Sequence, residues 1–159
     1  MTKEISIEDE NFTTFVKDIK TKILSSQYEA LKAVNKELIN LYWEIGKNIV
    51  EKQELFGWGK SVVQNLSHEL QKEFVGMKGF SVQNLWNMRY FYLEYHENEK
   101  LQTLSREIGW SHNIAIFQKN KDELEREFYI KMVIKFGWTY RVLDNHIDNK
   151  SYEKYLLNQ

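Results

Sequence analysis

The side chains best suited to bind a metal or transfer a proton are four histidines, and their spacing argues against both roles. No two of them lie three or four residues apart, the spacing that would place a pair on one face of a helix. The chain also has no Cys, so it cannot form a thiolate metal site. The sequence therefore predicts no metal site and no cofactor. The four are His68, His96, His112 and His146.

No catalytic nucleophile is predicted either. Ser111 and His112 are adjacent, which is poor geometry for a nucleophile and its base on one helix, and Ser111 is better suited to cap a helix. Glu123, Glu125 and Glu127 are spaced two apart, so on a helix neighbours diverge by about 200° and form a solvated face. We expect a chain without catalytic residues.

Gly59-Lys60-Ser61 matches the end of a phosphate-binding P-loop, but the rest of that motif is missing. Glu54 stands where the motif requires its first glycine, and a helix is expected before the site in place of a strand. A nucleotide site is therefore disfavoured. The start of a helix that carries Lys60 could still hold a nucleic-acid phosphate. Lys60 and Ser61, with Lys78 further on, are candidate contacts to a DNA backbone.

Residues 60–96 have the order helix, short glycine-containing link, helix, which is typical of a DNA-binding helix-turn-helix. The first helix is expected over 60–74, and the second begins after Ser81, whose hydroxyl is suited to cap it. Gly76 and Gly79 interrupt the link. We predict a helix-turn-helix or winged-helix-like core in this region.

The second helix of this core has a polar side that could contact DNA. At 100° per residue, one side of it holds Gln83, Trp86, Asn87, Tyr90 and Glu94, with Arg89 at the boundary. Gln and Asn can pair with adenine edges, and Arg can hold a phosphate or a guanine. We predict Gln83, Asn87 and Arg89 as contacts to bases or phosphates.

The alternative function is an oligomerisation or protein-docking module without direct DNA binding. Apolar residues spaced by three or four form a stripe suited to a helical-bundle or coiled-coil seam: Leu31, Val34, Leu38, Leu41, Ile45 and Ile49. Exposed aromatic residues would equally suit a protein interface. The candidates for this interface, with a homodimer as one outcome, are Leu31, Leu38, Ile45, Trp86 and Tyr90.

The composition indicates which elements position these side chains. The chain has 159 residues, no Pro and only seven Gly, so few residues break helices, and 42% apolar content fits a globular domain. We predict a compact all-α fold. With 22 Lys and Arg against 23 Asp and Glu, any DNA binding must rest on a local patch.

Apolar spacing divides this fold along the chain. It predicts a helical region within 1–27, an interruption at Ser25-Ser26, and a long supporting helix over 28–54. We expect a single domain over 1–159, in which 28–155 form the recognition part. The remaining helices are expected at 60–74, 81–96, 112–120, 122–136, 139–148 and 151–158.

Three helix junctions carry a glycine followed by a tryptophan, at Gly57, Gly109 and Gly137. Glycine can adopt the left-handed conformation that ends a helix, and the next apolar residue can pack back onto the last turn.

No apolar run follows a basic start, and none approaches the roughly 20 residues that span a bilayer. Together with the absence of Cys, this is compatible with a cytoplasmic protein that has no membrane partner.

Several motifs resemble the N-terminal domain of the YhcG-type family of bacterial proteins. They occur in order and cover about residues 28–155. They are Leu41-Tyr42-Trp43-Glu44-Ile45-Gly46; Gly57-Trp58-Gly59-Lys60-Ser61-Val62-Val63; Leu66-Ser67 with Leu70; Gly79-Phe80-Ser81; Asn84-Leu85-Trp86; Met88-Arg89-Tyr90-Phe91-Tyr92; Trp110-Ser111-His112-Asn113; Arg126-Glu127-Phe128-Tyr129; and Gly137-Trp138 with Arg141-Val142-Leu143.

In that family the helical domain is described as winged-helix-like or DNA-binding, and it precedes a PDDEXK-type nuclease domain. The resemblance implies a non-catalytic DNA-recognition or targeting module for a metal-dependent nuclease, linked with mobile elements or restriction and defence systems. It also implies a nuclease domain as the partner in full-length relatives.

The sequence departs from the family pattern in two respects. The nuclease core requires Glu-x-Lys, and no Glu here has Lys two positions on, so the nuclease domain is expected to be missing. The family usually carries basic residues just after Ser81, where Val82 and Gln83 stand here. The second departure predicts fewer phosphate contacts.

Overall fold

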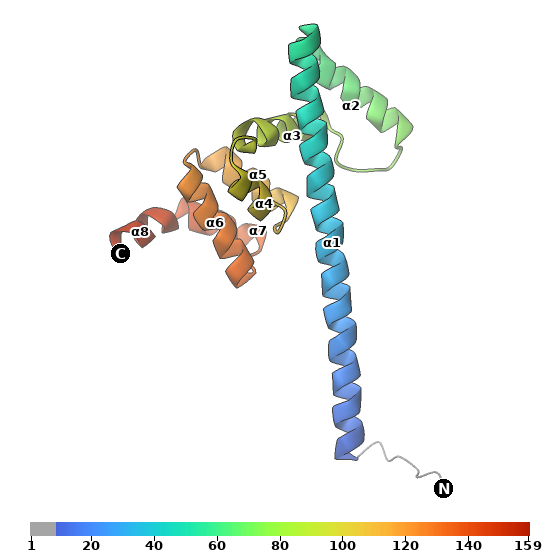
Figure 1. The fold of residues 1–159 in the computed structure, drawn as a ribbon, viewed down its shortest axis with the longest axis vertical. Helices are drawn as coiled ribbons and strands as arrows, with labels where there is room; N and C mark the ends of the chain where they lie inside the picture. The colour runs from blue at the N-terminus through green and yellow to red at the C-terminus, as the bar shows by residue number, and fades with distance from the viewer. Residues whose placement is uncertain (1–8) are drawn as a thin grey trace. The chain divides into compact units, whose positions relative to one another are not determined.

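The computed structural model describes residues 9–159, and within them it contains eight helices and no strand (Figure 1). The prediction of an all-α fold is confirmed. The helices are α1 Glu10–Phe56, α2 Ser61–Glu73, α3 Val82–Tyr95, α4 Glu99–Ser105, α5 Trp110–Lys119, α6 Glu123–Phe136, α7 Tyr140–Asp148 and α8 Ser151–Leu157.

The chain divides into two compact units, one ending at Val34 and the other spanning Asn35–Gln159. In the first, the described residues from Glu10 onward belong to α1. The second holds the rest of α1 and the other seven helices of the described chain. The single domain over 1–159 stays a prediction.

The interruption expected at Ser25-Ser26 is wrong, because α1 continues without a break from Glu10 to Phe56. Serine costs a helix interior at most about 0.7 kcal/mol relative to alanine. The residues that follow, up to Ala33, are mostly good helix formers such as Glu, Ala, Leu and Lys. Two serines are therefore too weak to end a helix without Gly or Pro beside them.

The structure adds α4, which the sequence pattern did not predict. This helix has only seven residues, too few for a periodic apolar stripe, and it is stabilised by a local cap. The Asn98 side chain accepts a hydrogen bond of 3.0 Å from the backbone N–H of Leu101.

The predicted start of α5 also needs correction. The helix begins at Trp110 with Gly109 in an extended conformation at its cap, so Ser111 lies in the first turn and is not the cap. The Asn113 side chain stabilises this start, because its amide donates to the Ser105 and Gly109 carbonyls at 2.9 and 3.0 Å.

Other local predictions are confirmed. The Ser81 hydroxyl caps α3 by accepting from the Asn84 backbone N–H at 3.1 Å. Gly57 and Gly137 have φ angles of 66° and 63°, the left-handed conformation expected after a helix. At Gly109 the prediction of a left-handed conformation is wrong, because its φ is −69°.

One hydrophobic cluster of the second unit joins the C-terminal part of α1 to α2 and α3. In this cluster α1 and α3 approach closely at Gly46, where a Cβ would overlap the backbone carbonyl of Met88. Only glycine lets α1 and α3 meet at this distance. The buried members are Tyr42, Ile49, Val63, Phe80, Leu85 and Met88.

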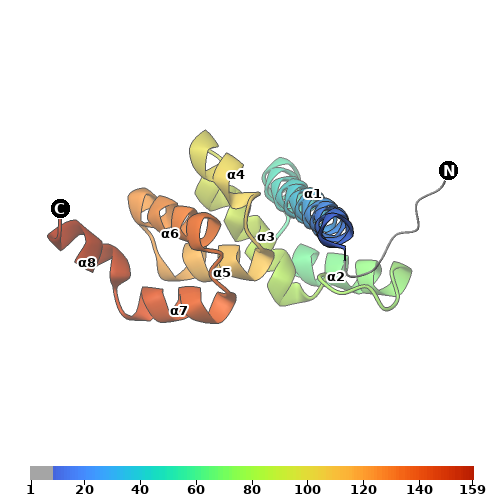
Figure 2. The ribbon, with the colours of Figure 1, turned by 90° about the horizontal axis from the view of Figure 1, so that it is seen from below.

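A second, larger cluster is rich in aromatic side chains and joins α1 and α3 to α4, α5, α6 and α7. Figure 2 shows α3 between α2 and α5, with α6 and α7 beyond α5. Phe91 of α3 makes an edge contact with Trp43 and stacks on Phe117, at centroid distances of 5.2 and 5.9 Å. The two clusters together hold α3 as the central helix of this unit.

The helix–link–helix order expected over 60–96 is present. The link spans residues 74–81, longer than the turn of about three to four residues in a helix-turn-helix. The Ser67 hydroxyl and the Gln71 amide donate to the Phe80 carbonyl at 2.6 and 3.1 Å and so fix the end of this link. The winged-helix-like detail stays a prediction.

Candidate nucleic-acid interface

Two neighbouring hollows share Trp86 of α3, and we call them together the Trp86 surface. Residues of α2, α3 and the α5–α6 region line them, so the surface combines three parts of the second unit. The first hollow is lined by Lys60, Ser61, Gln64, Val82 and Trp86. The second is lined by Gln83, Trp86, Asn87, Arg89, Tyr90, Gln118 and Lys121.

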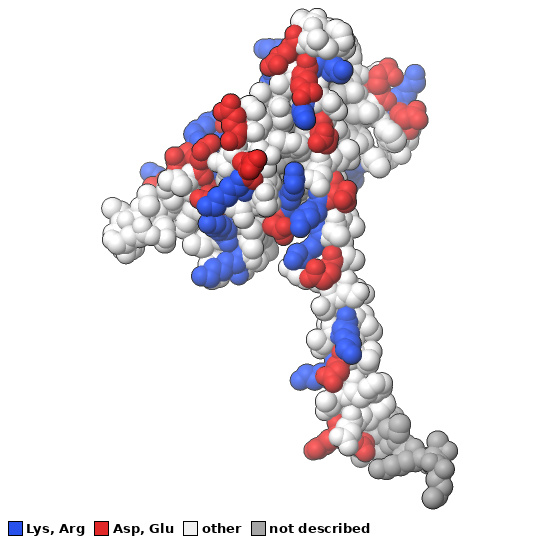
Figure 3. Space-filling view, viewed as in Figure 1, with Lys and Arg blue, Asp and Glu red and all other residues white. Residues whose placement is uncertain are grey.

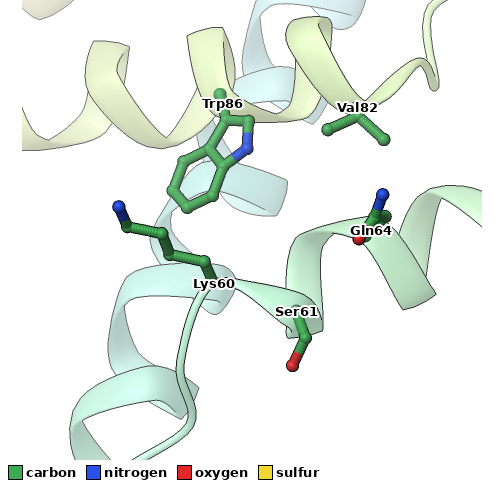
Figure 4. A pocket seen from close by; sticks show the side chains of 5 residues that line it. All are labelled: Lys60, Ser61, Gln64, Val82 and Trp86. Carbon is green, nitrogen blue, oxygen red and sulfur yellow. The ribbon is translucent and has the colours of Figure 1, made fainter.

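The first hollow lies at the start of α2. Figure 4 shows the Lys60 side chain extending toward the Trp86 ring, whereas the Ser61 hydroxyl points away from α3. No side chain caps the start of α2, whose cap position is Lys60 itself. The positive end of the helix dipole and the Lys60 ammonium thus lie at the same edge of the surface.

Arg89 is held in place by a residue of α1 that the sequence analysis did not single out. Its Nε donates to Oε1 of Gln53 at 2.7 Å, and its guanidinium lies 5.4 Å from the centre of the Trp86 ring. The Gln53 amide also donates to the Gly59 carbonyl at 3.3 Å. Gln53 therefore fixes both Arg89 and the chain just before Lys60.

Lys121 brings a further cation to the surface. Its Nζ donates to the Tyr90 hydroxyl at 2.7 Å and lies 5.2 Å from the centre of that ring. Tyr90 in turn packs against Phe117 of α5. Lys121 was not predicted, because nothing in the local spacing of the sequence shows that the α5–α6 link folds against α3.

The amide side chains of the second hollow form a network around Asn87. Asn87 is 9% exposed, and its Oδ1 accepts from Gln118 at 2.9 Å and from Gln83 at 3.5 Å. An Asn that reads adenine needs both its oxygen and its amide nitrogen free to reach the base. Asn87 is therefore better suited to hold the Gln83 and Gln118 side chains in position than to contact a base itself.

Glu94 is the one acidic residue of α3, and a buried arginine balances its charge. Nη2 of Arg126 donates to Oε1 of Glu94 at 2.7 Å. Burial alone would raise the pKa of Glu94, but hydrogen bonds from Arg126 and Tyr90, with the charges of Arg126 and Lys121, hold that pKa below its ordinary value. The carboxylate stays ionised and paired.

Arg126 also fixes the turn that carries Lys121. It is only 2% exposed, and it donates to the Asn120 carbonyl at 2.6 Å and the Phe117 carbonyl at 3.0 Å. These carbonyls belong to the last turn of α5 and its cap. One buried guanidinium therefore connects Glu94 on α3 to the segment just before Lys121.

The family model described as "DUF1016 N-terminal domain" matches residues 18–154 of this chain. The chain belongs to this family. The match begins before the region expected from the motifs, 28–155, and ends one residue earlier.

A relative of this DUF1016 N-terminal domain is a protein of Escherichia coli (strain K12) named "Putative nuclease YhcG". The two are 29% identical over 84% of this chain. The chain spans 44% of the length of that relative, less than half of it. No solved structure matches this chain.

In this DUF1016 N-terminal domain, most of the predicted DNA contacts lie on the Trp86 surface, and one does not. Lys60, Ser61, Gln83, Asn87 and Arg89 all line the Trp86 surface. Lys78 lies in the 74–81 link, is exposed, and lines neither hollow.

The predicted protein-interface residues are split between two places. Trp86 and Tyr90 are half-buried on the Trp86 surface. Leu31 and Leu38 are 69% and 37% exposed on α1. Ile45 lines a different hollow, the α1–α2 groove, which is formed by Leu41, Ile45, Asn48, Ile49, Lys52, Trp58, Val62, Leu66, Leu70, Phe74, Met77 and Phe80.

Within residues 9–159, no three His, Asp or Glu side chains are gathered so that they could hold a metal ion. The described helices also include none that is long and apolar enough to cross a membrane.

Proposed function

We propose that this chain is a DNA-targeting module of a nuclease and that it contacts DNA through the Trp86 surface. The observation that carries this proposal is the convergence of three cations from separate elements. Lys60 lines the first hollow, Arg89 and Lys121 line the second, and the two hollows share Trp86. Cations beside aromatic rings are suited to a phosphate backbone and its bases. Two comparisons support the assignment: the chain belongs to the DUF1016 N-terminal domain family, and it is similar to a protein named "Putative nuclease YhcG".

The side chains have different roles in this proposal. Lys60 and Lys121 contact phosphates, because each lines a hollow and carries a compact positive charge. Arg89 is held by Gln53 through Nε, which leaves its terminal nitrogens to meet a phosphate or a guanine edge. Gln83 is exposed and approaches a base edge.

The remaining candidates have supporting roles. Trp86 offers a ring face for stacking, and Asn87 holds the Gln83 amide in place. Ser61, whose hydroxyl points away from α3, and Lys78, which lines neither hollow, add contacts to the DNA backbone. This arrangement explains how a chain with a net charge of −1 could bind DNA: the charge is local and not general.

Binding to a fluorescent DNA duplex, measured by anisotropy at a series of salt concentrations, tests this function. We expect the logarithm of the affinity to fall linearly with the logarithm of salt concentration. Lys60→Gln and Lys121→Gln should each weaken binding and reduce the salt slope by about 1. Lys135→Gln, the same charge change at an exposed position of α6, is the matched control and should change neither.

Absence of binding at low salt, with both linear and supercoiled DNA, would contradict the proposal. So would equal losses for Lys135→Gln and Lys121→Gln, because binding would then depend on overall charge. A nuclease assay with added Mg²⁺ tests the further inference that this chain is non-catalytic. Cleavage by the chain alone would refute it.

We further propose that the complete nuclease acts in mobile elements or in restriction and defence systems, from the cytoplasm. Protection of cells against incoming foreign DNA, compared between the intact and the disrupted gene, measures this role. Equal uptake of foreign DNA by both strains would argue against it.

A protein-docking module is the second candidate, and one observation favours it. The stripe expected to form a seam is only partly covered in the second unit: Ile49 is buried, whereas Leu38 and Leu41 are 37% and 47% exposed, and Leu41 lines the α1–α2 groove. Exposed apolar rows of this kind mark interaction sites. Sedimentation of the wild type and of Leu38→Asp tests it, since a loss of self-association without loss of DNA binding would support docking.

A further inference from the structure

The polar side of α3 lies in a recess between neighbouring helices. Residues of α2 line the first hollow beside α3, and residues of α5 and of the α5–α6 link line the second hollow. Figure 2 shows α3 between α2 and α5. A helix that reads paired bases enters the major groove, which is about 12 Å wide, and a single helix with its side chains is already about 10–12 Å across. With a neighbour on each side, α3 is poorly placed to enter that groove, so a base has to leave the duplex to reach it.

Amide groups form the floor of the second hollow. Asn87 is 9% exposed, and its Oδ1 accepts hydrogen bonds from Nε2 of Gln118 at 2.9 Å and from Nε2 of Gln83 at 3.5 Å. Among the residues that the structure describes, no donor engages Oε1 of either glutamine, so both oxygens remain to accept from a base. The Watson–Crick edge of a base is available to such groups only when the base is unpaired.

Two aromatic rings flank these amides. Trp86 and Tyr90 are four residues apart, so they lie on one side of α3, about 6 Å apart along its axis. Both line the second hollow and are half-buried, which leaves part of each ring open. Tyr90 packs against Phe117 at 5.4 Å between ring centres, and the Arg89 guanidinium lies 5.4 Å from the centre of the Trp86 ring. Rings held in this way can stack on an unpaired base without further ordering.

Cations line both of the hollows that meet at Trp86. Lys60 is in the first, and Arg89 and Lys121 are in the second. Figure 3 shows Lys and Arg interspersed with Asp and Glu over one face of the second unit, so the two signs of charge are mixed there. A few cations beside one indole match the phosphates that flank a single base.

We propose that the second hollow binds one unpaired base of DNA, stacked on Trp86 and with its hydrogen-bonding edge on the amides of Gln83 and Gln118. The hollow has a volume of about 340 Å³, within the range of about 300–1,000 Å³ that is typical of small-ligand sites. Lys60 and Lys121 then meet the phosphates on either side of that base.

This inference rests on the DNA-binding function proposed above and names its substrate class, which is DNA that carries an unpaired nucleotide. Such a nucleotide occurs in a bulge or in a single strand. A fully paired duplex supplies one only after a base has been unpaired and unstacked, which costs free energy. The paired duplex is therefore bound mainly through its phosphates, and more weakly.

Fluorescence anisotropy with three DNAs of one sequence, at a single salt concentration, tests the proposal on the full chain. The first is a paired duplex, the second has one extra unpaired adenine at its centre, and the third has an abasic nucleotide in place of that adenine. We expect the bulged duplex to bind about tenfold or more tightly than the paired duplex, because its base is already unpaired. The abasic bulge has no base to stack, so its affinity should return to that of the paired duplex.

Equal affinities for the bulged and the abasic duplex would overturn the proposal, because the protein would then recognise the distorted backbone and not the base. Equal affinities for the bulged and the paired duplex would overturn it as well. A single strand of the same sequence separates the two sources of an unpaired base. If it binds more tightly than the paired duplex, single-stranded DNA is a source, and if only the bulge does so, the base comes from a duplex; both results support the proposal.

Substitutions in the hollow should change the preference for the bulge, which is the ratio of the bulged to the paired affinity. Trp86→Ala should lower the affinity for the bulged duplex about tenfold or more and that for the paired duplex less, so the ratio falls toward one. Lys60→Gln should weaken both complexes alike and leave the ratio unchanged, because it removes a phosphate contact. Equal losses on both DNAs for Trp86→Ala would contradict the proposal.

A matched pair of exposed glutamines tests the amide floor without disturbing the core. Gln118→Ala should reduce the preference for the bulge roughly two- to tenfold, since a hydrogen bond to the base is lost. Gln64→Ala changes an amide of the first hollow and should leave the preference unchanged. Equal preferences in Gln118→Ala and the wild type would show that the floor does not contact the base.

A bulge that carries 2-aminopurine, a fluorescent analogue of adenine, reports stacking directly, because its emission falls when it stacks on another ring. At saturating protein, the emission should be lower with the wild type than with Trp86→Ala. Equal emission with the two proteins would contradict stacking on Trp86.

Failure of this inference and failure of DNA binding give different results. If the paired and the bulged duplex bind equally, with an affinity that falls as salt rises, DNA binding stands and the base site is wrong. If neither DNA binds at low salt, the DNA-binding function fails and the base site fails with it.

Discussion

The Trp86 surface and the α1–α2 groove lie on different faces of the same helix, α2, and one is polar and cationic whereas the other is apolar. Gln64 and the preceding Lys60 belong to the first, whereas Val62, Leu66 and Leu70 belong to the second. The Trp86 surface combines cations, amides and one indole. The groove combines apolar side chains with only two polar ones, Asn48 and Lys52. One short amphipathic helix thus separates a surface suited to nucleic acid from a surface suited to protein docking.

The two surfaces also differ in what lies beneath them. The Trp86 surface depends on polar contacts, with Arg126 and Asn87 holding its parts through hydrogen bonds. The groove rests on an apolar cluster and on the close approach of Gly46 to Met88. Polar contacts have demanding geometry, so the first surface should be the more sensitive to substitutions underneath it.

The largest effect should come from Arg126→Ala. It leaves the Glu94 carboxylate without its partner and frees two carbonyls of the α5 end, so the free energy of unfolding should fall by about 3–5 kcal/mol. Urea unfolding followed by circular dichroism measures this loss. Arg141→Ala, at an exposed arginine, is the control and should stay within about 0.5 kcal/mol of the wild type. A small loss for Arg126→Ala would mean that Lys121 is positioned by other contacts.

Gly46→Ala should have the next largest effect. The added Cβ would overlap the Met88 carbonyl, so α1 and α3 must separate, at a cost near the upper end of about 1–3 kcal/mol. The thermal midpoint and the urea midpoint should both fall. Gly59→Ala adds a methyl group where nothing lies within 4 Å, and it should be tolerated. An unchanged midpoint for Gly46→Ala would show that the helices cross less tightly.

Trp86→Ala and Trp58→Ala form a matched pair, because one tryptophan lies on each surface. Trp86→Ala should weaken DNA binding by about 1–3 kcal/mol through loss of base stacking and leave self-association unaffected. Trp58→Ala should weaken self-association and leave DNA binding unaffected. Anisotropy and sedimentation on both variants measure the two properties. If Trp86→Ala and Trp58→Ala weakened DNA binding equally, the two surfaces would not have separate functions.

The smallest effect is a pH dependence at Glu94. Its pKa lies below the ordinary value near 4.5, so the pair with Arg126 stabilises the fold fully above that value. The contribution is lost as pH falls through the lowered pKa, because protonation then removes the charge. Urea midpoints of wild type and Glu94→Gln, compared from pH 6 down to pH 3, should converge at the acid end. A constant gap across that range would contradict the assignment.

The sequence predicted much of the fold through residues that act locally. The absence of proline indicated long helices, the Ser81 hydroxyl capped α3, and Gly137 ended α6 in the left-handed conformation. Predictions failed where a local signal was weak. Ser25-Ser26 lacks the strength to break a helix, and α4 is too short to show a periodic pattern.

The candidate site was predicted only in part. Helical spacing placed Gln83, Trp86 and Arg89 near one another, because they are close on a single helix. Spacing could not show that Asn87 is buried, since that depends on Gln118 of α5 packing against it. It also could not show Lys121, which reaches Tyr90 only after α5 and α6 have folded onto α3.

By itself the sequence determined the helices, their caps and turns, and the apolar stripe of α1, since each depends on residues within a few positions of one another. Tertiary structure decided which of these features are covered. It buried Asn87 and Arg126, placed Lys60, Arg89 and Lys121 in two hollows that share Trp86, and left Leu38 and Leu41 of the stripe exposed. Side-chain burial and the convergence of distant charges depend on how helices pack, and no local spacing encodes that packing.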